Sequence, residues 1–226
     1  MSGRDDRSKR LWNVLTERER KTALNDPEYF LTRMLGYDMK PFHRRWFEFQ
    51  KSHKRTLILA PRGHGKTTVC NIAYSLWRLL DDRERRVFIV SSTAEQAEAI
   101  MREIRQHLER NPALQMHLAP RKGPLWRSNQ LYLPDLRRLS KEASVTATGV
   151  FGPVITRHYD LIVLDDVVDE ETAFSQHMRE RLFTWFHKVL APCLEPDGEM
   201  HVLGTRYHRD DLYGRLISAA AAVERI

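Results

Sequence analysis

A glycine-rich turn between an apolar run and an amphipathic segment constrains the fold of this chain more than any other feature. Residues 57–68 read LILAPRGHGKTT, and apolar side chains recur at helical spacing after them. Gly63 and Gly65 permit a tight turn whose backbone N–H groups point inward, and the N-terminus of the following helix adds its dipole. A strand, a glycine-rich loop and a helix in this order predict a phosphate-binding P-loop.

The residue types in this turn suit a nucleoside triphosphate and Mg²⁺. Lys66 can reach the β- and γ-phosphates, and the Thr67 hydroxyl can bind the metal. The pattern G-x-x-x-x-G-K-S/T is met except at its first position, where Ala60 stands instead of glycine. A turn that only caps a helix is the alternative interpretation. The other nucleotide-binding residues predicted in this turn are Arg62, Gly63, His64, Gly65 and Thr68.

Two consecutive carboxylates end a second apolar run. The run is Leu161–Leu164, and Asp165 and Asp166 follow it. Four apolar residues in succession indicate a strand that is buried on both faces of a parallel sheet, and ligands of open α/β sheets bind beyond the carboxyl ends of such strands. We therefore predict Asp165 as a metal ligand and Asp166 as the carboxylate that polarises the attacking water. The alternatives are a strand followed by a helix cap, and Glu170 as the activating carboxylate.

The rest of the chain alternates strand and helix signals, which is typical of an α/β fold with a parallel sheet. The expected strands are 57–59, 87–90, 131–133, 143–147, 161–164 and 200–204. A long helix is expected from about 94 to 109, and Pro-Asp-Gly at 196–198 predicts a turn. The last strand ends at Thr205, and a small polar residue at such a tip can contact the γ-phosphate.

Residues 1–54 are predicted to form a helical N-terminal arm, and residues 55–226 the P-loop core. Within the arm, Phe42, Trp46 and Phe49 recur at i, i+4 and i+7, which places them on one helical face. Core packing is one interpretation of this face. The other is that Phe42 and Trp46 hold an adenine ring by stacking.

The charge of the chain suits a polyanionic partner. The sequence holds 37 Lys and Arg against 30 Asp and Glu, and residues 1–55 account for 14 of the basic and 8 of the acidic residues. A solvated face is the alternative interpretation. A second basic cluster consists of Arg121, Lys122, Arg127, Arg137, Arg138 and Lys141.

The sequence also indicates the compartment. The longest apolar stretches have the length of strands, so we expect no membrane span and no membrane partner. The first ten residues are charged rather than apolar, which predicts no secretory signal. Cys70 and Cys193 lie far apart in the sequence, and without an export signal we expect reduced thiols in a cytosolic compartment.

Taken in order, these motifs resemble the large terminase subunit of tailed bacteriophages, the DNA-packaging motor. The resemblance covers about residues 40–218 and implies a P-loop NTPase of the ASCE type, RecA-like, with a mainly parallel central sheet flanked by helices. The residues that carry it are PFH at 41–43 with Trp46, LILAPRGHGKTT at 57–68, TRH at 156–158, DLIVLDD at 160–166, WF at 185–186, LEPDG at 194–198, GTRYH at 204–208, DDL at 210–212 and GRL at 214–216.

The resemblance implies an activity and partners. The activity is ATP hydrolysis that powers translocation of double-stranded viral DNA into a procapsid, with ATP and Mg²⁺ as cofactors. The implied partners are double-stranded DNA, the small terminase subunit and further copies of the chain in a homo-oligomeric ring on the capsid portal. The implied location is the host cell cytoplasm, and transiently the portal of the procapsid.

The resemblance also assigns roles to single residues. Lys66 and Thr67 match the family's phosphate and metal positions, Asp165 its metal-binding aspartate, and Asp166 its catalytic carboxylate, which is glutamate in many relatives. Three more candidate catalytic residues follow from the same matches. They are Arg62 in the P-loop, Thr205 in the coupling motif GTR, and Arg157, which matches an arginine supplied to a neighbouring subunit's site.

Two further expectations concern the limits of this function. Family members carry a nuclease domain after the ATPase, and only 21 residues follow Thr205, so we expect ATP hydrolysis without DNA cleavage. Two other functions stay open. One is a helicase-like DNA-dependent ATPase, which would need a second lobe, and the other is a non-catalytic, nucleotide-dependent DNA-docking module.

Overall fold

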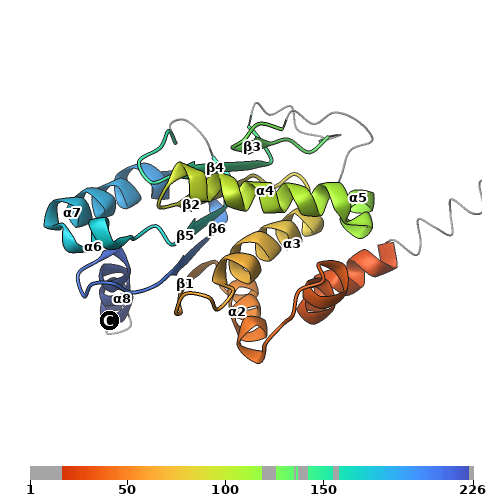
Figure 1. Ribbon diagram of the computed structural model, residues 1–226, viewed down its shortest axis with the longest axis horizontal. Helices are drawn as coiled ribbons and strands as arrows, with labels where there is room; N and C mark the ends of the chain where they lie inside the picture. Colours follow the sequence, from red (N-terminus) through yellow and green to blue (C-terminus); the bar gives the residue numbers. More distant parts are fainter. Residues whose placement is uncertain (1–16, 119–125, 135, 137–141, 155–157, 224–226) are drawn as a thin grey trace, which may run out of the picture.

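The computed structural model describes residues 17–118, 126–134, 136, 142–154 and 158–223, with helices on both sides of a central sheet (Figure 1). The strands are β1 (Arg55–Leu59), β2 (Val87–Ser91), β3 (Gln130–Leu131), β4 (Val145–Gly149), β5 (Tyr159–Asp165) and β6 (Leu194–Gly204). The helices before β5 are η1 (Tyr29–Met34), α2 (Pro41–Ser52), η2 (Thr67–Ala73), α3 (Tyr74–Asp81), α4 (Ala94–Arg110) and α5 (Pro112–His117). Those after β5 are α6 (Glu170–Phe174), α7 (Gln176–Trp185), η3 (Phe186–Leu190), η4 (Ala191–Cys193) and α8 (Leu212–Val223).

The two strands that carry the predicted site are not neighbours in the sheet. The sheet runs β1-β6-β5-β2-β4-β3, with parallel pairing except between β3 and β4. The strand after the carboxylate strand in sequence, β6, therefore lies between the P-loop strand β1 and the carboxylate strand β5. The predicted mainly parallel central sheet flanked by helices is confirmed, and β6 is an additional strand between the two motif strands.

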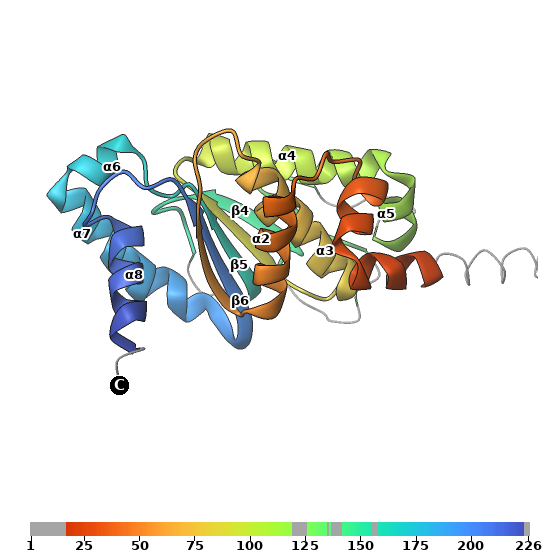
Figure 2. The ribbon, with the colours of Figure 1, turned by 90° about the horizontal axis from the view of Figure 1, so that it is seen from below.

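Alternate residues of the central strands bury against opposite helical layers. Val87 and Ile89 of β2 belong to a cluster with η1, α2, η2, α3, α4 and α5, whereas Phe88 and Val90 belong to one with α6, α7, η3 and α8. Figure 2 shows these two groups of helices on either side of the strands. A strand buried on both faces explains the continuous apolar runs in the sequence.

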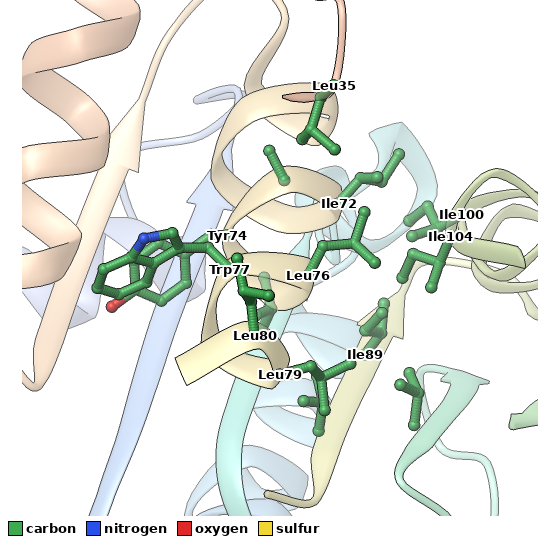
Figure 3. Packing of buried hydrophobic residues seen from close by; sticks show 14 of the residues in the cluster. Leu35, Ile72, Tyr74, Leu76, Trp77, Leu79, Leu80, Ile89, Ile100 and Ile104 are labelled. Carbon is green, nitrogen blue, oxygen red and sulfur yellow. The ribbon is translucent and has the colours of Figure 1, made fainter. Parts of the chain in front are cut away.

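The helix that follows the P-loop forms the centre of one layer. Leu76 and Leu80 are fully buried, and Figure 3 shows Ile72 and Leu76 pointing towards Ile100 and Ile104 of α4. Burying each such side chain contributes about 1.5–3 kcal/mol of transfer free energy. This packing anchors the helix whose N-terminus carries Lys66 and Thr67.

The N-terminal helices pack onto this same layer. Residues 17–25 are helical, and Arg20 donates from Nε to the Leu80 carbonyl (2.8 Å) and from Nη2 to the Asp81 carbonyl (2.7 Å). Phe30 and Leu31 are fully buried in the cluster that contains the P-loop helix. The arm thus supports the back of the nucleotide-binding segment.

The apolar face predicted for α2 is a core face only in part, because Trp46 packs against the core whereas Phe49 does not. Phe49 is 40% exposed, whereas His43, Phe47 and Gln50 are buried. The Phe47 ring packs against the rings of Tyr74 (5.3 Å between centroids) and Trp77 (5.5 Å). Because α2 has aromatic side chains on two faces, its packing against α3 decides which face is buried.

The turn predicted at 196–198 is wrong. Strand β6 passes through these residues, and its pairing with β5 shifts register between Tyr159–Leu194 and Leu161–Glu199. Over this stretch β5 advances by two residues and β6 by five. The Pro-Asp-Gly signal therefore marks a β-bulge rather than a reversal of the chain.

Candidate functional site

Two glycines with left-handed backbone shape the P-loop between β1 and η2. The φ angles are 76° at Gly63 and 73° at Gly65. A Cβ atom added at Gly65 would also lie 3.0 Å from Nε2 of His43, whereas one at Gly63 would meet nothing within 4 Å. Gly65 is therefore required both by its conformation and by the side chain packed against it.

His43 of α2 holds the outer side of the loop. Its Nδ1 accepts from the Lys40 backbone N–H (3.1 Å), so the proton is on Nε2, which donates to the His64 carbonyl (2.8 Å). The ring is 8% exposed. His43 was not predicted as a site residue, although it belongs to the PFH motif, because the motif does not show which atom of the loop it contacts.

Lys66 is folded against the backbone of its own loop. Its Nζ donates to the carbonyls of Ala60 (2.7 Å) and Pro61 (3.1 Å) and to the hydroxyl of Thr205 (3.2 Å). Thr205 in turn donates to the Ala60 carbonyl (3.2 Å). The structure thus brings the predicted strand-tip residue Thr205 into direct contact with the predicted phosphate-binding lysine.

The predicted metal ligands also meet. Asp165 is 2% exposed and accepts from the Thr67 hydroxyl (3.1 Å) and from Asn71 Nδ2 (2.9 Å). Burial raises the pKa of Asp165 to about 6, against the lowering effect of the Asn71 hydrogen bond.

A hydroxyl and one carboxylate suit Mg²⁺, which keeps several waters and binds substrate phosphates rather than all-protein cages. Within the described residues there is no group of three or more His, Cys, Asp or Glu side chains placed to hold a metal. Thr67 and Asp165 are therefore the residues that would hold Mg²⁺.

Asp166 has an unusual backbone conformation at the end of β5. Its φ is 47°, an unusual conformation for a side chain larger than glycine, and its N–H donates to the Leu203 carbonyl (3.0 Å). Its buried Oδ1 has no hydrogen-bond partner within the described part of the chain. Asp169, by contrast, caps α6 by accepting from the Thr172 N–H (2.8 Å), and Glu170 is exposed in the first turn of that helix.

These groups line one cleft of about 580 Å³. Its walls come from the P-loop, from the ends of β2 and β5, from the start of α4 and from the segment after β6. The side chains that matter for chemistry are Arg62, His64, Lys66, Thr67, Asp165, Asp166, Ser91, Ser92, Gln96 and Tyr207. Sequence reasoning missed Ser91, Ser92, Gln96 and Tyr207, which only the fold brings to the cleft.

The remaining predicted residues lie at the mouth of the cleft or outside its lining. Arg62 is exposed at the mouth of the cleft, where Nη2 donates to the Tyr207 hydroxyl. The rings of Phe42 and Trp46 pack on each other (5.0 Å), and Phe42 lies 5.9 Å from the His64 ring, outside the lining of the cleft. Thr68 is half-buried in the first turn of η2.

Two basic features lie wholly or largely outside the described residues. Arg157 is one of them. The second basic cluster is represented in the described chain by Arg127, which is exposed. The structure therefore places neither the predicted trans-acting arginine nor most of the second basic cluster.

A larger hollow of about 890 Å³ lies between the N-terminal helices and α4 and α5. Glu19 and Glu103 line it beside Arg33, Arg102 and Arg110, so its charges are mixed. None of these residues belongs to the phosphate or metal motifs, and the predicted site residues line the smaller cleft.

In the described part of the chain, none of the helices combines the length and the apolar character that crossing a membrane requires.

Comparison with known proteins adds sequence and fold similarity. No family model matches the chain. The chain is 27% identical over 169 residues to the large terminase subunit of Enterobacteria phage T3, and the match covers 73% of this chain and 28% of that protein. The chain thus spans less than a third of the length of this relative.

A solved structure has the same fold. It is the large terminase ATPase domain of Thermus phage P74-26, with a TM-score of 0.52 at 17% identity, covering 78% of this chain and 68% of that one. The predicted RecA-like P-loop fold is therefore confirmed. The chain has the fold of a large terminase ATPase domain, and most of its length is similar in sequence to a phage large terminase subunit.

Proposed function

We propose that this chain hydrolyses ATP and that hydrolysis powers translocation of double-stranded viral DNA during genome packaging. The observation that supports ATP hydrolysis is the meeting of Lys66, Thr67, Asp165 and Asp166 in one cleft behind a glycine-rich loop. The similarity to a terminase large subunit supports the packaging context.

Binding of the triphosphate rests on the P-loop. Backbone N–H groups of the loop and the N-terminus of η2 attract the phosphates, and Lys66 exchanges its hydrogen bonds to Ala60, Pro61 and Thr205 for phosphate oxygens. Thr67 and Asp165 hold the metal position. Mg²⁺ at this position supplies charge neutralisation between the β- and γ-phosphates.

The chemical step rests on Asp166. Its unpartnered Oδ1 accepts a hydrogen bond from the attacking water and takes its proton as the water oxygen bonds to the γ-phosphorus and the bond to the β–γ bridging oxygen breaks. Thr205 contacts the γ-phosphate from the tip of β6. Arg62 leaves the Tyr207 hydroxyl and stabilises the charge on the transferred group.

Steady-state release of inorganic phosphate in the presence of Mg²⁺ tests this proposal. Lys66→Ala and Asp165→Ala should each reduce turnover to background, because positioning of phosphate and metal accounts for most of phosphoryl-transfer catalysis. Tight ATP binding without turnover by the wild-type chain would favour the non-catalytic docking module instead.

The proposed partners follow from the family resemblance and the charge. They are double-stranded DNA, a small terminase subunit and further copies of the chain in a ring on the capsid portal, in the cytoplasm of the host. DNA binding should be independent of sequence and should weaken steeply as salt rises, because a motor grips phosphates and releases their counterions. A flat salt dependence would oppose a DNA-translocating role for this domain.

A further inference from the structure

Asn71 contacts the metal-binding carboxylate from the P-loop helix. It lies four residues after Thr67 in η2, is 0% exposed, and donates from Nδ2 to Oδ2 of Asp165 at 2.9 Å. The other oxygen of the same carboxylate, Oδ1, accepts from the Thr67 hydroxyl at 3.1 Å. Each oxygen of Asp165 therefore has its own partner on one helix.

The fully buried amide side chain of Asn71 requires an explanation. A buried polar group destabilises a fold unless it is hydrogen-bonded, and Asn71 Oδ1 has no partner within the described residues. The neighbouring positions Val69, Cys70, Ile72 and Ala73 are buried and apolar, so Asn71 is the polar residue among them. The contact with Asp165 is the interaction that the amide provides here.

We propose that Asn71 is a positioning residue that orients the metal-binding carboxylate, an inference that rests on the proposed function. By holding Oδ2, its amide leaves Oδ1 beside the Thr67 hydroxyl as the oxygen that faces the metal. Thr67 Oγ1 and Asp165 Oδ1 lie 3.1 Å apart, so the two groups that would hold the metal stand side by side.

Because the carboxylate of Asp165 is buried, its orientation should affect metal affinity. Asp165 lies at the end of β5 and cannot exchange its protein contacts for water, because it is 2% exposed. Without the Asn71 donor, rotation of the carboxylate would leave Thr67 Oγ1 and Asp165 Oδ1 no longer side by side. Metal affinity should then fall although both ligands are still present.

Fluorescently labelled ADP measures this effect without turnover. Its affinity is determined first in EDTA and then as a function of added Mg²⁺, for the wild type and for Asn71→Leu. For Asn71→Leu, the Mg²⁺ concentration that gives half of the change in ADP affinity should be at least tenfold higher than for the wild type. Its affinity for ADP in EDTA should stay within twofold of the wild-type value. Equal Mg²⁺ dependence in the two proteins would overturn the inference.

Ser75→Ala is the matched control. Ser75 lies one turn further along the same helical segment, is fully buried, and its hydroxyl also has no hydrogen-bond partner within the described residues. Its removal should leave the Mg²⁺ dependence unchanged. If it matched Asn71→Leu, loss of a buried polar group alone would explain the effect, and the positioning role would be rejected.

Two more variants complete the test. Asn71→Asp replaces the amide donor by a carboxylate and should weaken Mg²⁺ binding. If Mg²⁺ instead increased the ADP affinity of this variant at lower concentrations than in the wild type, residue 71 would be a direct ligand and the inference would be overturned. Asn71→Ala provides the same comparison if Asn71→Leu does not fold, as judged by thermal unfolding. Absence of any Mg²⁺ effect in the wild type, or an unchanged effect in Asp165→Ala, would instead refute the proposed function.

Discussion

The ammonium group of Lys66 lies 3.2 Å from the hydroxyl of Thr205, so the P-loop lysine touches the tip of β6. Strand β6 pairs with β1 on one side and with β5 on the other. A displacement at Thr205 is therefore transmitted to both strands that carry the nucleotide site. We therefore predict a coupling role for the segment that begins at Gly204.

Thr205→Val should separate binding from turnover. The variant keeps the shape of the side chain but removes the hydroxyl, while Lys66 keeps its bonds to the carbonyls of Ala60 and Pro61. We expect KM for ATP to stay within about threefold and kcat to fall about tenfold or more, as for loss of a group that acts mainly in the transition state. Steady-state kinetics with Lys66→Ala as the binding-defective control checks this, and an unchanged kcat would exclude Thr205 from the reaction.

Asp166→Asn should bind Mg-ATP and fail to hydrolyse it. The amide keeps the size of the side chain but cannot take the proton of the attacking water, so only the chemical step is affected. Binding of labelled ATP and phosphate release measure the two properties separately. Glu170→Gln is the control and should stay active, since Glu170 is exposed outside the lining of the cleft. The reverse pattern would make Glu170 the base.

Asp165→Asn should stabilise the protein while destroying its metal site. The pKa of Asp165 is raised from 3.8 to about 6, mainly by burial, so the native state binds the proton more tightly than the unfolded state does. The free energy of unfolding of the wild type therefore falls as pH rises from about 4 to above 6. Asp165→Asn carries no ionisable group at this position, so its free energy of unfolding does not fall with pH in this way. At pH 7.5 it should exceed the free energy of unfolding of the wild type by about 1–3 kcal/mol.

Urea unfolding in EDTA at pH 7.5 and at pH 4 checks this expectation. The advantage of Asp165→Asn should shrink towards zero at the lower pH, where the native carboxyl is already protonated. An advantage that is the same at both pH values would show that charge burial at Asp165 is not its cause.

Gly65→Ala should impair nucleotide binding more than Gly63→Ala. Both glycines have left-handed φ, so alanine costs about 1–2 kcal/mol at either position. The alanine methyl group at position 65 would also press on His43, which holds the loop through the His64 carbonyl. We expect a further tenfold loss of ATP affinity in Gly65→Ala. Equal affinities in the two variants would show that His43 does not fix the loop.

Arg157 stays a prediction, because it lies outside the described residues. An arginine that reaches a neighbour's γ-phosphate increases the rate by roughly 10³–10⁵, so activity per chain should rise with protein concentration. Arg157→Ala and Asp166→Asn, each inactive alone, should regain turnover when mixed, since mixed assemblies pair an intact site with an intact arginine. Activity that is independent of concentration, with no rescue on mixing, would favour Arg62 as the stabilising arginine.

The parts of the site that the sequence predicts are those whose signal is local. The P-loop and the paired carboxylates each consist of an apolar strand followed at once by chemical groups, so a short window contains both the structure and the function. Asn71 gives no such signal, because its partner Asp165 is 94 positions away. Ser91 likewise becomes informative only when the pairing of β2 with β5 places its hydroxyl 2.9 Å from the Asp165 carbonyl.

The two errors in the fold have a similar cause. In α2, aromatic residues occupy two neighbouring faces, and the local periodicity does not show that Tyr74 and Trp77 take up Phe47. At 196–198, residues that usually reverse the chain form a bulge, because β6 pairs with β5 both before this stretch, at Leu194, and after it, from Glu199. Tertiary contacts decided both outcomes.

The position of β6 also determines when the site can form during synthesis. Strand β1 has a single neighbour in the described sheet, β6, which begins 135 residues after the end of β1. At about 5–20 residues per second, a ribosome needs roughly 7–27 seconds to make the intervening chain. The P-loop strand must wait through that interval with both edges unpaired, shielded by α2 and α3 or by a chaperone. We therefore predict that nucleotide binds only after β6 has been made, so a ribosome-bound chain that stops before it should not retain ATP.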